Sequence, residues 1–175
     1  MKRTWCVFCL LSCLAIAGSA KAADEGKLEI AGGYSVLHVE AASSNFQGGA
    51  LDVAIAATPW LAVVGEIGTD GTKANMLADI SLHVHAFLAG PRYLVHAREN
   101  VAVFGQVLFG DAMSNAILDG VESSRSDLAI QPGGGIDIDV GPKWAVRFEG
   151  DYRAVRANAA TTKQERFLVG LVFHP

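Results

Sequence analysis

Two histidines, His83 and His85, lie two residues apart in this sequence. Side chains two residues apart point to the same face of a β-strand, so the pair could supply two ligands to a metal ion. In a polar protein interior the same rings are more often hydrogen-bonded fillers that respond to pH. We therefore predict that they are part of an interior polar network, with no metal site and no cofactor.

A denser set of ionisable residues lies between Trp144 and Ala154. Every second residue from 147 to 153 is charged, namely Arg147, Glu149, Asp151 and Arg153. The alternate positions are Trp144, Val146, Phe148, Gly150, Tyr152 and Ala154. Because successive side chains of a strand point to opposite faces, this segment predicts a strand with one ionic face and one apolar face.

Eight segments show a comparable alternation, and no long helical stripe of apolar residues occurs after the N-terminal region. The segments are residues 27–39, 48–57, 61–69, 78–94, 100–110, 128–140, 144–154 and 164–173. In the fourth we assign Ile80, Leu82, Val84 and Leu88 to the apolar face. The faces that tolerate charge hold Glu29, Asp52, Glu66, His83, His85, Gln106, Asp137 and Asp139.

The connections are predicted to alternate between short and long. Short turns follow the second, fourth and sixth segments, at Thr58-Pro59-Trp60, around Ala97-Arg98-Glu99, and at Gly141-Pro142-Lys143. Longer connections include residues 111–127 and 155–163. Outer-membrane barrels have short periplasmic turns and longer external loops. The sequence therefore predicts an all-β fold, a closed eight-stranded antiparallel up-and-down transmembrane barrel in the outer membrane of a diderm bacterium.

Aromatic residues fit this orientation. Trp60 and Trp144 come at the short turns, where they would form a periplasmic aromatic girdle. Phe109 and Tyr152, near the far ends of their segments, would mark the outer girdle. Pro91 cannot donate to a strand ladder, so we expect a bulge or a strand end at Gly90-Pro91, and a bulge would turn Arg92 inward.

The interior of an eight-stranded barrel is just wide enough to be filled by side chains. We therefore expect the inward charges to pair with one another, because buried charges are costly unless paired. The predicted interior polar network comprises Glu66, His83, His85, Asp137, Arg147, Glu149, Asp151 and Arg153. Acids outnumber bases in it.

The N-terminal residues predict export. Lys2 and Arg3 precede an apolar run from Trp5 to Ala17, which is too short to span a bilayer as a helix. Ala20-Lys21-Ala22 then gives a cleavage site between Ala22 and Ala23. We predict a helical signal peptide over residues 1–22 and one barrel domain over residues 23–175. Lipidation at Cys13 is a less favoured alternative.

Removal of this segment leaves 11 basic and 18 acidic residues, a formal net charge of −7, and no cysteine. An acidic chain without a basic patch argues against nucleic acid as a partner. The Gly133-Gly134-Gly135 run lacks the Lys-Ser/Thr of a phosphate loop. No serine, histidine and acid are brought together by a spacing that predicts catalysis, so we expect a non-enzymatic protein.

Several pieces of the chain resemble the bacterial outer membrane protein β-barrel family, the small eight-stranded group that includes the membrane domain of outer membrane protein A and the opacity-type adhesins. They are residues 32–35 (GGYS), 58–61 (TPWL), 87–93 (FLAGPRY) and 133–137 (GGGID), with Arg147 and Asp151-Tyr152. The resemblance implies outer-membrane lipid as surroundings. It also implies recognition of a C-terminal aromatic residue, here Phe173, by the outer-membrane assembly machinery.

We expect a monomer with a structural or surface-interaction role, in which the external loops form the contact surface. A narrow or gated pore and a lipid-modifying enzyme remain alternatives. A soluble periplasmic barrel remains a fourth, and it would need the opposite orientation, with apolar faces inward.

Overall fold

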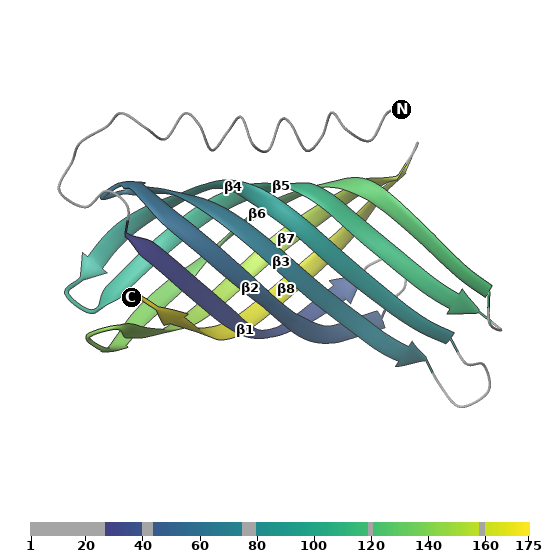
Figure 1. The fold of residues 1–175 in the computed structure, drawn as a ribbon, viewed down its shortest axis with the longest axis horizontal. Coiled ribbons are helices and arrows are strands. Elements are labelled where there is room, and N and C mark those ends of the chain that lie inside the picture. Colours follow the sequence, from purple (N-terminus) through teal and green to yellow (C-terminus); the bar gives the residue numbers. More distant parts are fainter. Residues whose placement is uncertain (1–26, 40–43, 75–79, 119–120, 158–159) are drawn as a thin grey trace.

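The computed structural model describes residues 27–39, 44–74, 80–118, 121–157 and 160–175, and the predicted signal peptide and its cleavage site lie outside them. Eight strands form one closed barrel (Figure 1). They are β1 (Leu28–Val39), β2 (Ser44–Thr58), β3 (Leu61–Ala74), β4 (Ile80–Arg98), β5 (Val101–Leu118), β6 (Val121–Gly141), β7 (Trp144–Ala157) and β8 (Ala160–Phe173).

Every strand pairs antiparallel with its neighbours in the chain, and β1 closes the barrel against β8 from Ile30↔Phe173 to Val39↔Gln164. The predicted closed, eight-stranded, up-and-down topology is therefore confirmed. Closure leaves no free strand edge around the middle of the barrel, which is the condition for strands to cross hydrocarbon. No helix in the described residues is long and apolar enough to cross a membrane.

The three short turns lie together at one end. They lie between β2 and β3, β4 and β5, and β6 and β7, and the strand register shifts beside each, at Ala56/Thr58, His96/Arg98 and Asp139/Gly141. The C-terminus is at the same end, where the amide of His174 donates to the carbonyl of Lys143 at 2.9 Å (Figure 1). The turns agree with the sequence prediction.

The long connections predicted over residues 111–127 and 155–163 are wrong. β5 continues to Leu118 and β6 begins at Val121, while β7 continues to Ala157 and β8 begins at Ala160. On the other side of β6, pairing with β7 stops at Leu128↔Arg156. Residues 121–127 of β6 therefore pair only with β5, and β3 to β6 reach farthest at the end opposite the C-terminus (Figure 1).

Apolar side chains cover the outside of the barrel. Large hydrophobic residues such as Leu128 and Phe167 are 65% and 67% exposed, and similar residues come from all eight strands. We call this outward surface the apolar belt. Beyond it, toward the far end, the outward positions become polar, for example His38 in β1, Asp111 in β5 and Glu165 in β8. A lipid-facing band between polar ends is the pattern of an outer-membrane barrel.

Candidate functional site

The charged side chains at the inward positions of the strands contact one another inside the barrel. We call this group the lumen network. Four arginines with no exposed surface form its centre: Arg92, Arg147, Arg153 and Arg166. Each occupies an inward position of β4, β7 or β8, because alternate residues of a strand point to the same side. The acids that line the lumen are Glu29, Asp52, Glu66, Asp70, Asp137, Glu149 and Asp151.

On the side of the short turns, Arg92 and Arg147 hold the same two acids. Arg92 donates to Glu29 and to Asp52, each at 2.8 Å. Arg147 donates to Glu29 at 2.7 Å, to Asp52 at 3.2 Å and to both oxygens of Asp137. The ring of Phe104 contacts both guanidinium groups, with its centre 4.6 Å from that of Arg92 and 4.5 Å from that of Arg147. Such cation–π contacts are strongest where water is excluded.

Further along the lumen, Arg166 joins three acids. It binds Glu66 with two hydrogen bonds of 2.8 and 2.6 Å, and it also reaches Glu149 at 3.0 Å and Asp151 at 2.7 Å. Two parallel N–H···O bonds are the strongest geometry that an arginine and a carboxylate can adopt. Arg153 lies 3.5 Å from Glu66 and donates to Gln131 at 2.6 Å.

Gln106 connects the two halves. Its oxygen accepts from Arg92 at 2.8 Å, and its amide nitrogen donates to Glu149 at 3.0 Å. The lumen network is therefore continuous, and it connects residues of all eight strands. A glutamine suits this place because it donates and accepts at once.

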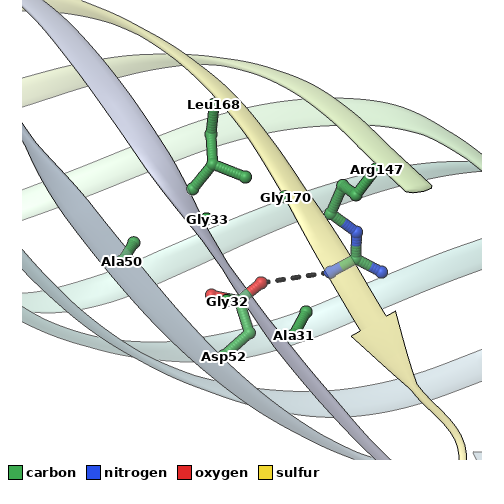
Figure 2. A pocket seen from close by; sticks show the side chains of 8 residues that line it. All are labelled: Ala31, Gly32, Gly33, Ala50, Asp52, Arg147, Leu168 and Gly170. Atoms are coloured by element: carbon green, nitrogen blue, oxygen red, sulfur yellow. Dashed lines mark hydrogen bonds and ion pairs between the residues drawn. The ribbon is translucent and has the colours of Figure 1, made fainter. Parts of the chain in front are cut away.

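The network leaves little free space. A small pocket lies between β1, β2 and β8, bounded by the Arg147–Asp52 ion pair and by Gly33 and Gly170 (Figure 2). It has no room for a water molecule. Apolar side chains line another part of the lumen, including Val64, Leu88, Leu108 and Val155. Side chains thus fill the barrel at this level, as expected for eight strands.

One group of carboxylates offers oxygens within the reach of a metal ion. Asp52, Glu66 and Glu149 each place one oxygen within 4.8 Å of the others. All three already accept hydrogen bonds from arginines, namely Arg92 and Arg147 for Asp52, and Arg166 for both glutamates. Guanidinium groups thus supply the positive charge here, and the group has the chemistry of an ion-pair network.

The structure places six of the eight predicted network residues together in the lumen. Glu66, Asp137, Arg147, Glu149, Asp151 and Arg153 are buried, and they are at most 6% exposed. The inward charges pair with one another as expected, for example Arg147 with Asp137 and Arg153 with Glu66. The predicted excess of acids is present as well.

The inward prediction for His83 and His85 is wrong. Both lie on the outer face of β4, His83 exposed and His85 half-buried, whereas Val84, Ala86 and Leu88 point into the lumen. The reason is that β4 contributes apolar residues to the lumen along this stretch, so its polar face is the outer one there. Nor is there a bulge at Gly90-Pro91, because the register with β3 passes through both residues unshifted. Arg92 points inward with the same parity as Leu88.

Sequence reasoning missed several members of the lumen network. Arg166 is the most connected of them, and Gln131, Asp70 and Phe104 also point inward. The signal for Arg166 was present, because Gln164 and Arg166 alternate with the outward Phe167 and Val169. The Ser35 hydroxyl donates to Asp70 at 2.5 Å, a contact between β1 and β3 for which the sequence holds no local signal.

Aromatic residues gather at the short-turn end. Trp60 packs against Tyr93 at 5.5 Å between ring centroids, and Trp144 packs against Phe173 at 4.7 Å. Both tryptophans are about half exposed on the outside. Phe109 and Tyr152 lie within β5 and β7 rather than at their ends, at outward positions just before the polar Asp111 and the charged Arg156.

One titratable group of the site lies beyond the last strand. The imidazole of His174 is 3.7 Å from the carboxylate of Glu29. This hydrogen-bonding acid raises the pKa of His174 above its usual value of 6.5. The charged form of His174 therefore adds to the ion pairs of Glu29 at the end of the barrel.

A closed eight-stranded barrel with an apolar belt, aromatic residues at the turn end and a charged interior defines the class of small outer-membrane barrels. A family model described as "Outer membrane protein beta-barrel domain" matches residues 6–174. The chain belongs to this family, and its location is the outer membrane of a Gram-negative bacterium. The family resemblance stated from the sequence motifs is confirmed.

Solved structures of the same class are similar to the whole barrel. Ail, the attachment invasion locus protein of Yersinia pestis, is 19% identical, with a TM-score of 0.62 over 85% of this chain and 98% of Ail. Neisserial surface protein A is 10% identical, with a TM-score of 0.68 over 85% of this chain and 96% of that one. OprG from Pseudomonas aeruginosa is 11% identical, with a TM-score of 0.55 over 89% and 98%. At these identities the likeness concerns the fold, and no curated protein sequence matches the chain.

Proposed function

We propose that this protein is a non-enzymatic surface-interaction barrel, which offers the outer ends of its strands to partners outside the cell. The observation that carries the proposal is the polar extension of β5 and β6. These strands continue past the apolar belt as a hairpin with exposed Ser114, Ser124, Arg125 and Ser126. A polar sheet that rises beyond the lipid has no function in spanning the membrane, and it is accessible to other surfaces.

The filled lumen favours a role as a solid scaffold and argues against a role as a pore. Ion conduction needs a continuous water-filled path, and the lumen network occupies the cross-section with ion pairs of 2.6–3.2 Å around Arg92, Arg147 and Arg166. Rigid walls suit a protein that presents a binding surface, because little ordering entropy is lost when a partner binds.

The polar contacts of three histidines and of Ser35 also favour a non-enzymatic role. His38 bonds Asn45, His85 bonds Thr69, and His174 lies against Glu29, while the Ser35 hydroxyl is engaged by Asp70 inside the barrel. A hydrolase of the serine–histidine type needs a serine within hydrogen-bond reach of the base. The name of the similar Ail, an attachment invasion locus protein, fits the same kind of role.

Two measurements on one pair of proteins test the proposal. The pair is the wild type and a variant in which residues 114–125 are replaced by Asn-Gly, which shortens the hairpin but keeps β5 and β6 within the belt. Cells that display the wild type should attach to heparin-coated or collagen-coated surfaces more than cells that display the variant. Planar bilayers should show no conductance steps with either protein. Equal attachment of the two proteins to both coatings, or regular conductance steps, would contradict the proposal.

A further inference from the structure

In the structure, a residue of another strand lies next to the outward pair His83 and His85, and the sequence alone did not predict this neighbour. In the strand register, His85 lies opposite Met113 of β5, and His83 lies opposite Asn115. Met113 also points outward and is 38% exposed. Residues directly opposite one another in an antiparallel pair have Cβ atoms about 4.5–5.5 Å apart. Two imidazoles and one thioether therefore occupy neighbouring positions on one exposed face.

The two rings lie close enough for both to reach one ion after rotation of their side chains. Their centroids are 6.3 Å apart and their planes are within 10° of parallel. A metal bound by one nitrogen of each ring, at about 2.0–2.1 Å per bond, keeps the centroids roughly 6–7 Å apart at most. The ring spacing is within this limit, and rotation of the two side chains would bring one nitrogen of each ring to a shared ion.

A second hydrogen bond orients one of these rings. The Nδ1 atom of His85 lies 3.0 Å from the Thr69 hydroxyl of β3. Histidines that bind metals commonly use one ring nitrogen for such an orienting bond, which leaves the other as the ligand. On the same side of β4, the residue of β3 directly opposite His83 is Gly71, which has no side chain to cover the ring.

We propose that His83, His85 and Met113 form a binding site for a cuprous ion on the outer face of the barrel, just beyond the apolar belt. Thioether sulfur is a soft ligand that selects Cu(I), and imidazole also suits copper. The nearest outward acid on β5 is Asp111, two residues from Met113, and its exposed carboxylate favours the approach of a cation. The site is independent of the lumen network and of the proposed surface-interaction function.

Competition for Cu(I) tests the proposal. The protein is purified from outer membranes in detergent without a polyhistidine tag. Any of the cysteines 6, 9 and 13 that the purified chain retains is alkylated, so that thiolates cannot bind the metal. Copper is then titrated without oxygen and with ascorbate, in competition with bicinchoninate, whose copper complex is coloured. The wild type should take up one Cu(I) per chain.

Three variants identify the ligands. The double variant His83→Asn/His85→Asn should take up no copper, and Met113→Leu should lower the affinity for Cu(I) about 10-fold or more while changing Zn(II) affinity little. His38→Asn, which alters an exposed histidine elsewhere on the barrel, should bind as the wild type does. Unchanged heat-dependent gel mobility shows that each variant is folded.

Three results would overturn the proposal. They are no copper uptake by the wild type, an equal loss of uptake in His38→Asn, or an unchanged Cu(I) affinity in Met113→Leu. The last result, together with equally tight Zn(II) binding, would define a two-histidine site without selectivity for copper.

Discussion

Arg166 is the residue on which most of the lumen network depends. Its guanidinium binds Glu66, Glu149 and Asp151, and it has no exposed surface. Arg166→Met would leave three carboxylates inside the barrel without their shared counter-ion. Removal of one partner from a buried ion pair typically costs about 3–5 kcal/mol. We expect a loss of this size in the free energy of unfolding, measured by urea titration of tryptophan fluorescence in lipid vesicles.

Arg156→Met provides the matched comparison. Arg156 is an exposed arginine at the outer end of β7, and exposed charges contribute little, about 0–1 kcal/mol. A similar change in stability for the two variants would mean that the ion pairs of Arg166 are not what stabilises the interior.

His174 links stability to pH at the turn end of the barrel. The neighbouring Glu29 raises the pKa of His174 in the folded state above 6.5. The protonated ring therefore adds stability below pH 6.5, and this contribution is lost as the pH rises through the raised pKa. His174→Asn should destabilise the protein more at pH 5.5 than at pH 9, by well under ~1 kcal/mol because the ring is half exposed. Urea titrations at both pH values check the sign, and a larger loss at pH 9 would contradict it.

At the scale of the strands, a glycine in β6 makes room for the ring that contacts two arginines. A methyl group on Gly135 would overlap the carbonyl oxygen of Phe148 and lie 2.8 Å from the ring of Phe104. Phe104 is buried, and its ring contacts Arg92 and Arg147. Gly135→Ala should therefore cost about 1–3 kcal/mol, the usual range for overpacking.

Gly65→Ala serves as the control in β3. No atom lies within 4 Å of the added methyl group at this position. Alanine also reduces the freedom of the unfolded chain, so the variant should be neutral or more stable by about 0.4–1 kcal/mol. The same urea titration separates the two variants, and equal effects would mean that Gly135 is not needed for packing.

The alternation of residue types predicted most of the strands, since one face of each must contact lipid. It predicted β7 best, where charged residues and apolar residues alternate without interruption from Arg147 to Arg153. The short turns at Pro59-Trp60 and Pro142-Lys143 were predicted from the short gaps between alternating segments, and the structure confirms them.

Where the prediction was wrong, the polarity of the lumen changes along one strand. β4 contributes apolar Val84 and Leu88 to the outer half of the lumen and Arg92 to the inner half. No local pattern distinguishes an apolar residue that faces lipid from one that faces an apolar lumen. Partners in the lumen network are also far apart in the chain, as in Arg166 and Glu66, which are separated by 100 residues. Only the register of all eight strands brings them together.

For the whole molecule, the apolar belt predicts how the barrel responds to a charge on its surface. Val169 is 52% exposed within the belt, and Glu165 lies four residues away on the same face of β8, beyond the belt. Val169→Arg should lower the stability in lipid vesicles by about 2–4 kcal/mol, whereas Glu165→Arg should change it by about 0–1 kcal/mol. Equal penalties would mean that the belt does not lie in hydrocarbon.

The sharing of Glu29 between Arg92 and Arg147 has a consequence for biogenesis. These three residues come from the first, fourth and seventh strands, and the acid is 63 and 118 residues from its two partners. In a partly formed sheet of a few strands, these charged side chains would approach the lipid acyl chains before their oppositely charged partners are in place. We expect insertion to be concerted, with partly assembled sheets kept at the aqueous boundary until the last strand docks against the first.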